Sequence, residues 1–395
     1  MNIAHSLQRA GLRSWFALCA LAAAVIGGCG GGVGTGGTGS YAQGTINGFG
    51  SIFVNDVRYD DTTAAVVDAN GNTKTRDDLR LGMTVSVEAG AVADNSGGPA
   101  ATASRIQYAS EMVGPLAAVD RTNGVLVVLG QTVTIDATTV FDDRLAGGVA
   151  ALAPGQLVEV YADDDPAGGR YRATRIEPHA AVTSYSLRGI ASQLSNGGRN
   201  FKIGSAAFSF AGTPPSTLVE GGFVRVTLQT AAPGSTQWVV QSFVNGPSAP
   251  PDGQSAHVKG LISSFASAAS FSVNGQAVTT AGASFPDGSA GLALGVRVEI
   301  EGTLSGGVLR ASQVSIQSDS EESGHGFELR GNITSVDLVA LTFKLRGVTV
   351  SYASPSLELD HGTLADILVG RRVEVRGVLS SDGTQVDAQR ITFDH

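Results

Sequence analysis

Carboxylates are the side chains of this chain whose types and positions could do chemistry. Glu159, Glu299 and Glu374 recur at the central position of a Val-x-Val or Val-x-Ile pattern. Two carboxylates that converged across a cleft could cleave a glycosidic bond. A catalytic pair has no need to recur in several copies, however, and a residue between two inward-facing valines points outward on a strand. We therefore interpret the three glutamates as exposed strand residues.

The densest acidic cluster is Asp163, Asp164 and Asp165, directly before Pro166. Carboxylate oxygens are the ligands that Ca²⁺ prefers, so the three are weak candidates for a metal site. They fall where a hairpin loop between two strands is expected, and a solvated loop explains them without a metal. A second group, Asp68-Ala-Asn-Gly-Asn72, lacks the distal glutamate of a calcium loop and predicts a turn. We expect no metal site and no cofactor.

Other catalytic signatures are missing from the sequence. The histidines outside the N-terminal segment (His179, His257, His325, His361 and His395) show no metal-ligand spacing, and there is no G-x-S-x-G elbow or Walker loop. A formal G-x-G-x-x-G at residues 32–37 follows no strand pattern. These observations predict no catalytic residue and a non-enzymatic protein. The alternative is an enzyme with its site in a cleft between repeats.

Charge and aromatic content bear on nucleic acid as a partner. The net charge is −9, so phosphate contacts would release few counterions. Binding of single strands needs a basic groove with stacking rings, and Arg58, Tyr59 and Arg105 are too sparse to build one. We therefore expect no nucleic-acid partner, and we expect Trp238 to be a core or interface residue.

The N-terminal segment predicts where in the cell the protein is located. Arg9 and Arg13 precede an apolar run over residues 15–26, and Ile26-Gly-Gly-Cys29 follows. This segment resembles a bacterial lipobox, which implies removal of residues 1–28 and acylation, including palmitate, of Cys29. Gly30 stands where an inner-membrane retention signal would place Asp, so the expected location is the outer membrane of the cell envelope. Residues 29–42 then form the lipid anchor and a Gly-rich tether.

The remainder of the chain is built from repeats. Only 15% of the residues are charged, 42% are hydrophobic, and short alternating runs are separated by turn residues, which predicts an all-β protein. Four landmarks recur in the same order five times, beginning with an opening glycine at Gly44, Gly114, Gly189, Gly260 and Gly331. We predict repeats over residues 43–112, 113–183, 184–247, 255–318 and 325–394.

Each repeat carries about five short strand patterns. A short helix or turn is expected between the third and fourth strands, at residues 144–153, 289–294 and 363–369. This plan predicts small OB-like barrels, with small β-sandwich units as the alternative. The β-branched pairs, such as Val158/Val160 and Val298/Ile300, should point into the cores. Residues 247–253 and 318–324 have the composition of linkers.

The pattern resembles bacterial lipoproteins built from tandem copies of domain of unknown function 5666. The resemblance rests on the opening Gly-x-Ile/Leu, the hairpin Phe271–Val278 and the segment Leu292–Gly302, and it covers residues 43–394. It implies a fold and a location but no activity. Repeat 3 departs most, because Arg225 replaces the glutamate of the Val-Glu-Val pattern.

These observations predict a lipid-anchored envelope protein, a non-enzymatic adaptor or binding rod with an envelope protein or cell-wall polymer as a possible partner. The alternative is a cell-wall polymer or carbohydrate binding module. Because residues that recur in every copy are scaffold, a local function should lie where the copies differ. Those places are the Asp163 cluster, the repeat with Arg225, and the joints between repeats.

Overall fold

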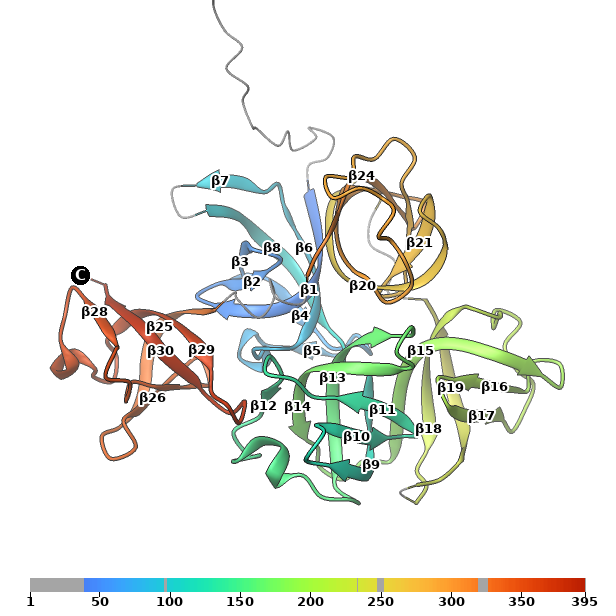
Figure 1. The fold of residues 1–395 in the computed structure, drawn as a ribbon, viewed down its shortest axis with the longest axis horizontal. Coiled ribbons are helices and arrows are strands. Elements are labelled where there is room, and N and C mark those ends of the chain that lie inside the picture. The colour runs from blue at the N-terminus through green and yellow to red at the C-terminus, as the bar shows by residue number, and fades with distance from the viewer. Residues whose placement is uncertain (1–38, 96–97, 233, 247–251, 319–325, 395) are drawn as a thin grey trace, which may run out of the picture. The chain divides into compact units, whose positions relative to one another are not determined.

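The computed structural model describes residues 39–95, 98–232, 234–246, 252–318 and 326–394. Its described part contains thirty strands and three short 3₁₀ helices, and no α-helix (Figure 1). The all-β prediction is therefore confirmed. The expected signal peptide, Cys29 and most of the tether lie outside the described residues, as do residues 247–251 and 319–325 of the two expected linkers.

The strands group into the five repeats in chain order. Repeat 1 contains β1 (Gly39–Phe49), β2 (Ile52–Val54), β3 (Val57–Asp60), β4 (Ala65–Val67), β5 (Thr73–Lys74), the 3₁₀ helix η1 (Arg76–Asp78), β6 (Thr84–Gly90), β7 (Ala93–Asn95) and β8 (Gly98–Tyr108). Repeat 2 contains β9 (Met112–Asp120), β10 (Val125–Val128), β11 (Gln131–Thr134), β12 (Val140–Phe141), η2 (Gly148–Ala151), β13 (Leu157–Asp165) and β14 (Arg170–Pro178).

The later repeats follow the same plan with fewer additions. Repeat 3 contains β15 (Ser184–Ser195), β16 (Asn200–Ile203), β17 (Ala206–Phe210), β18 (Phe223–Gln229) and β19 (Gln237–Asn245). Repeat 4 contains β20 (Ser255–Ser267), β21 (Ser270–Val273), β22 (Gln276–Thr279), β23 (Arg297–Ser305) and β24 (Val308–Ile316). Repeat 5 contains β25 (Phe327–Asp337), β26 (Thr342–Leu345), β27 (Val348–Ser351), β28 (Glu358–Asp360), η3 (Leu364–Asp366), β29 (Arg372–Leu379) and β30 (Val386–Phe393).

Each repeat closes into a five-stranded barrel. In repeat 4, β20 pairs with β21 and β23, β21 pairs with β22, β23 pairs with β24, and β22 closes the ring by parallel pairing with β24. Equivalent strands make the same ring in the other repeats. The OB-like barrel is therefore the observed unit. The segment between the third and fourth strands holds η2 and η3 in repeats 2 and 5, and turns over residues 289–294 in repeat 4.

The recurrent β-branched pairs lie in the barrel cores as predicted. All ten of these side chains are at most 3% exposed. The hairpin turns also match, since Asn274 and Gly275 have φ of 48° and 80°, the geometry of a two-residue turn with both residues left-handed. The residues that favour a tight turn thus account for the recurrent hairpin, and the alternation of buried side chains accounts for the recurrent Val-x-Val pattern.

The opening glycine is explained by the hairpin that packs on it. A Cβ at Gly44 would lie 2.1 Å from Oδ1 of Asn55, and one at Gly260 would lie 2.2 Å from Nδ2 of Asn274. The Asn55 side chain is held in place because its Nδ2 donates to the carbonyl oxygens of Gln43 and His257. Only glycine therefore fits beneath this hairpin.

We expect Gly44→Ala to destabilise the protein by about 1–3 kcal/mol, because the added methyl displaces the buried Asn55 amide. Gly212→Ala is the matched control, since its Cβ would meet no atom within 4 Å and its φ lies outside the left-handed region. Urea unfolding of the two variants measures the difference. Equal urea midpoints for the two variants would show that the close contact between Gly44 and Asn55 does not affect stability.

Repeats that are distant in sequence are joined by strand pairing. The first strand β1 pairs in parallel with β20 of repeat 4, from Ser40↔Ser255 to Gln43↔Val258. It also pairs with β25 of repeat 5, and repeats 1 and 5 share one hydrophobic cluster. An extended rod was expected, but these pairings place strands of repeats 4 and 5 beside β1 of repeat 1. The physical reason is that the long strand β1 has an edge beyond its own barrel that can bond another strand.

Candidate functional site

A polar cavity of about 360 Å³ is lined by residues of repeats 1 to 4, and we call it the central cavity. Its walls include Tyr41 of β1, Glu111 from the segment before β9, Asp164 of β13, Arg188 of β15 and Arg225 of β18. These side chains come from three different repeats. The cavity thus brings together the Asp163 cluster, the Arg225 repeat and the joints, the three places where the sequence predicted a local function.

Glu111 is the buried acid of the central cavity. Its Oε1 lies 3.3 Å from Nη1 of Arg188, and its Oε2 accepts a hydrogen bond of 3.0 Å from the backbone N–H of Ala162. Burial raises the pKa of Glu111 to about 7, although the charge of Arg188 acts in the opposite direction. The carboxyl is therefore fixed in place and close to half protonated near neutral pH. The sequence did not single out this residue, because no repeated landmark contains it.

The three consecutive aspartates lie on strand β13, so the predicted solvated loop is wrong. A β-bulge at Tyr161/Ala162 precedes them, and they pair with Arg170, Tyr171 and Arg172 of β14. This pairing lengthens the strand and moves the turn to residues 166–169. The Asp163 side chain lies 2.8 Å from Nη2 of Arg297, and Asp165 lies 3.1 Å from Nε of Arg170.

Two of the aspartates are therefore held by arginines, and the third faces the cavity. Burial, together with the charges of Asp165 and Asp163, raises the pKa of Asp164 to about 7. Within the described ranges, no group of three or more His, Cys, Asp or Glu residues could hold a metal ion. The candidates Asp163, Asp164 and Asp165 thus contribute ion pairs and one cavity carboxyl in this arrangement.

The raised pKa of Asp164 predicts a pH dependence. Between its ordinary value of 3.8 and about 7, the folded state holds a proton that the unfolded state has released, so stability falls as pH rises through this range. Glu111 adds a contribution of the same sign. We expect Asp164→Asn to be more stable than wild type by on the order of 2 kcal/mol at about pH 8, with little difference at about pH 4. Thermal melts across this pH range test it, and a difference independent of pH would contradict it.

Arg188 and Arg225 stand directly opposite each other on β15 and β18. The guanidinium of Arg188 lies 5.3 Å from the centre of the Phe223 ring and pairs with Glu111 on its other side. Arg225 donates to the carbonyl oxygen of Ala69 in repeat 1. Burial, and then the charge of Arg188, lower the pKa of Arg225. Two like charges on neighbouring strands therefore face one cavity.

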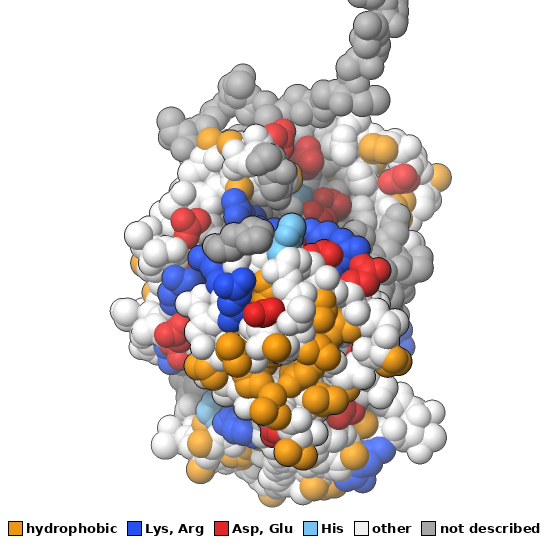
Figure 2. All heavy atoms as spheres, turned by 90° about the vertical axis from the view of Figure 1, so that its left-hand side faces the viewer, with side chains coloured by type: hydrophobic (Ala, Val, Ile, Leu, Met, Phe, Trp, Pro, Cys, Tyr) orange, Lys and Arg blue, Asp and Glu red, His pale blue; other side chains and the backbone are white. Residues whose placement is uncertain are grey.

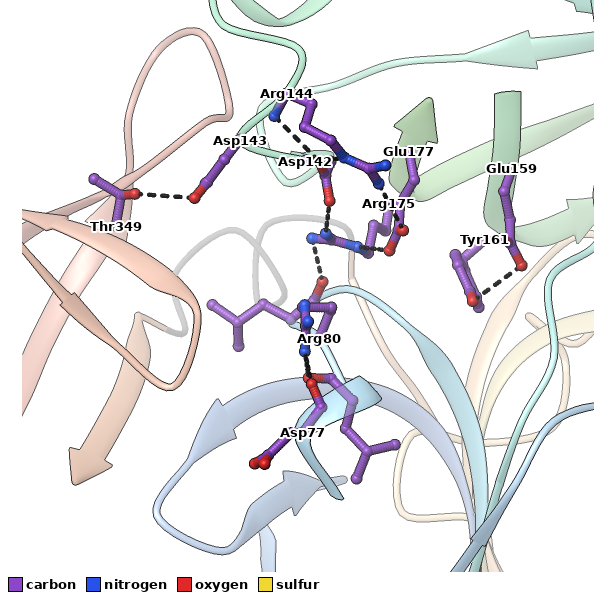
Figure 3. A network of polar contacts seen from close by, with 12 residues as sticks. Asp77, Arg80, Asp142, Asp143, Arg144, Glu159, Tyr161, Arg175, Glu177 and Thr349 are labelled. Carbon is purple, nitrogen blue, oxygen red and sulfur yellow. Dashed lines mark hydrogen bonds and ion pairs between the residues drawn. The ribbon is translucent and has the colours of Figure 1, made fainter. Parts of the chain in front are cut away.

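A second, larger cavity of about 690 Å³ is also lined by Arg225, and we call it the lateral cavity. Glu159 and Glu177 face each other across β13 and β14 at its wall, and Tyr161 donates to Glu159 over 3.1 Å (Figure 3). Burial, followed by the charge of Glu177, raises the pKa of Glu159. Glu159 is therefore a partly buried group rather than an exposed strand residue.

The other two recurrent glutamates are also partly buried, so their interpretation as exposed residues is wrong. Glu299 lies 2.5 Å from Nε2 of His257 and 3.0 Å from Nε2 of Gln317. Glu374 pairs with Arg330 and Arg376. Alternation correctly placed these glutamates on the outer face of their strands, but the neighbouring polar side chains cover them.

Arg175 anchors a network that sequence reasoning missed (Figure 3). It is 4% exposed, and it lies 3.0 Å from Asp142 and 2.6 Å from Glu177. Its Nη1 also donates to the carbonyl oxygen of Leu81, which ties repeat 2 to repeat 1. Asp143 reaches Thr349 of repeat 5 over 3.3 Å. The sequence did contain a signal for this residue, because an arginine recurs in the last strand of repeats 1, 2 and 5, as Arg105, Arg175 and Arg390.

The remaining predicted residues have structural roles. Asp68 accepts hydrogen bonds from the backbone N–H groups of Asn70 and Asn72, which confirms the turn. Trp238 is 1% exposed in the core shared by repeats 2 and 3, as predicted. Tyr59 is also 1% exposed and so presents no ring for stacking.

Repeat 5 presents an apolar patch to solvent. Figure 2 shows hydrophobic side chains gathered on this face. The exposed leucines and valines of repeat 5 come from two segments, the β25–β26 turn (Leu338 and Val339) and the η3 segment (Leu364, Leu368 and Val369), and they are 56–96% exposed. Exposed apolar patches of this kind mark surfaces that bind another protein or a membrane. We call this surface the repeat 5 patch.

Three segments of the chain, residues 113–177, 259–315 and 330–392, match the sequence model of the domain of unknown function DUF5666. They coincide with repeats 2, 4 and 5, each a closed barrel. These three segments are similar to the DUF5666 domain. Repeats 1 and 3 have the strand order of these segments, so the protein is a tandem array of one small barrel.

Two further comparisons assign no function to this array of barrels. Among solved structures, the chain is similar to drosophila Unr CSD456 at 13% identity and a TM-score of 0.15, with 55% of this chain and 99% of that chain covered. No curated protein matches the chain in sequence. No helix in the described part of the array is long and apolar enough to cross a membrane.

Proposed function

We propose that this protein is a non-enzymatic binding protein of the cell envelope that takes a small polar ligand into the central cavity. The observation that carries the proposal is the cavity itself, because side chains from four repeats meet there in a combination that no single repeat contains. Repetition of a small OB-like domain suggests a binding or adaptor role. A pre-formed cavity with a few fixed polar groups is the usual form of a small-molecule site.

The arrangement of charges supports binding over catalysis. Glu111 is held between Arg188 and the backbone N–H of Ala162, and Asp163 is held by Arg297. A general acid or base must reach the reacting atoms of a substrate, and these two carboxylates are already engaged by an arginine and, for Glu111, by a backbone N–H. Groups fixed in this way are better suited to orienting a ligand.

The experiment on the cavity uses the two exposed valines of repeat 3. Val244 lines the central cavity and is 46% exposed, whereas Val219 lies outside it and is 53% exposed. A thermal-shift screen of small polar metabolites and cell-wall fragments first identifies ligands of the mature chain. We expect Val244→Trp to abolish their binding and Val219→Trp to preserve it. Ligands that bind both variants equally would exclude the central cavity as the site.

Anchoring at the envelope forms the second part of the proposal. The lipobox-like segment ending at Cys29, followed by Gly30, supports lipidation and an outer-membrane destination. Incorporation of labelled palmitate should occur in the wild-type chain and be lost in Cys29→Ala. Label that persisted in this variant would contradict the anchor.

The repeat 5 patch supports an adaptor role toward another envelope protein. Its leucines and valines are exposed to water, so a partner that buried them would gain free energy. We expect Leu368→Asp to reduce crosslinking of the protein to its envelope partner in intact cells, while Val219→Asp leaves it unchanged. Equal crosslinking in both variants would remove the patch from the proposal.

A further inference from the structure

We propose that the central cavity binds the anionic group of its ligand, a carboxylate or a phosphate, through Arg225. This inference rests on the proposed function, because it assigns the chemical class of the ligand to the same cavity. The evidence is a charge arrangement that distinguishes repeat 3 from the other repeats.

Comparison of equivalent cross-strand positions isolates the difference. The residue before the opening glycine faces the central residue of the Val-x-Val pattern in each repeat. In repeat 4 this pair is Lys259↔Glu299, and in repeat 5 it is Arg330↔Glu374, which forms an ion pair. In repeat 3 the same positions hold Arg188↔Arg225. In repeats 1 and 2 the pair is Gln43↔Ser86 and Val113↔Glu159, so repeat 3 is the one with two like charges, which destabilise a sheet when they face each other.

The two arginines are compensated unequally within the protein. Arg188 has the carboxylate of Glu111 on one side and the Phe223 ring on the other. Arg225 makes its hydrogen bond to a backbone carbonyl, that of Ala69. Among the residues that the structure describes, no carboxylate lies within ion-pair distance of Arg225. The negative charge of Asp68 acts on Arg225 from beyond ion-pair distance, and an anion bound beside the partly buried guanidinium would offset more of its desolvation cost.

The cavity suits an anion that also carries hydroxyl groups. Its volume of about 360 Å³ is at the lower end of the range for small-molecule pockets. Asp164 and the backbone and side-chain groups around Ser86 provide polar partners away from Arg225. Because the pKa of Asp164 is raised to about 7, its carboxyl is largely protonated below neutral pH and repels an anion less than an ordinary aspartate would. Sugar acids and sugar phosphates combine these features.

The experiment is isothermal titration of the full mature chain with four probes: inorganic phosphate, glucose 6-phosphate, glucuronate and glucose. We expect binding of at least one anion and much weaker binding of neutral glucose. Arg225→Glu should weaken anion binding by roughly tenfold or more, because it removes a charge-assisted hydrogen bond. This variant should remain folded, since it restores the opposite-charge pair that repeats 4 and 5 already have.

A matched control and distinct outcomes complete the test. Arg310→Glu makes the same charge change at an exposed position of β24 outside the cavity, and it should leave the affinity unchanged. If both glucose 6-phosphate and inorganic phosphate bind, the recognised group is the phosphate. If only glucuronate binds, the recognised group is the carboxylate. Failure of all three anions to bind, or equal affinity in Arg225→Glu, overturns the inference. A neutral ligand that Val244→Trp excludes and Arg225→Glu still binds would overturn it while the proposed function stands.

Discussion

Replacing Arg297 by methionine should lower the free energy of unfolding by about 3–5 kcal/mol, the cost of removing one partner of a buried ion pair. Arg297 on β23 lies 2.8 Å from Asp163 on β13, and their side chains are 8% and 7% exposed. The variant leaves Asp163 without this partner, next to the carboxyl groups of Asp164 and Asp165. Urea unfolding at neutral pH measures the loss.

An exposed ion pair provides the matched control for this result. Arg390 pairs with Glu358, and their side chains are 50% and 61% exposed. Arg390→Met should therefore cost about 0–1 kcal/mol, because solvent screens such pairs. The double variant Asp163→Leu/Arg297→Met should recover part of the stability, since it leaves no buried charge at this contact. Similar losses in Arg297→Met and Arg390→Met would show that burial does not strengthen the contact between repeats 2 and 4.

Trp238→Ala should cost about 3–5 kcal/mol, because it opens a large cavity in the core shared by repeats 2 and 3. The indole is 1% exposed, and its ring centre lies 6.0 Å from that of Tyr185 in an edge-to-face arrangement. Calorimetry of the variant, compared with wild type, gives the change in stability.

Trp238→Phe separates the ring from its N–H group. The buried Nε1 of Trp238 is without a hydrogen-bond partner in the described part of the protein, so removing it relieves a desolvation cost. We expect this variant to lose much less stability than Trp238→Ala. A loss as large as that of the alanine variant would contradict the expectation that a phenyl ring fills most of the space of the indole.

The barrel and its core could be predicted because each rests on local pattern. Gly275 follows Asn274 where both residues must be left-handed, and Val298 and Ile300 alternate toward one face. These requirements repeat in every copy, so five copies reinforce each other. The opening glycines were also recognised by their recurrence, but the sequence did not reveal that a side chain of the hairpin packs on them.

Contacts between repeats could not be predicted in this way. Alternation places Glu159 on the outer face of β13, but it does not reveal that Glu177 and the lateral cavity lie there. The Asp163 cluster was assigned to a loop because a β-bulge that lengthens a strand leaves no distinct sequence signal. What the sequence did indicate was the exception, Arg225, since a charge reversal at a recurrent position is visible without a structure.

The shared strand β1 has a consequence for how the chain folds. Asn55, beside β1, donates to the carbonyl oxygen of His257, a separation of 202 residues. Sheets that depend on such distant partners form slowly, because a long loop must close before the bonds are made. During synthesis, the edge of β1 has no partner strand until repeats 4 and 5 have emerged. A chain that stopped after repeat 3 would keep this edge unpaired and would be prone to aggregate by pairing with other chains.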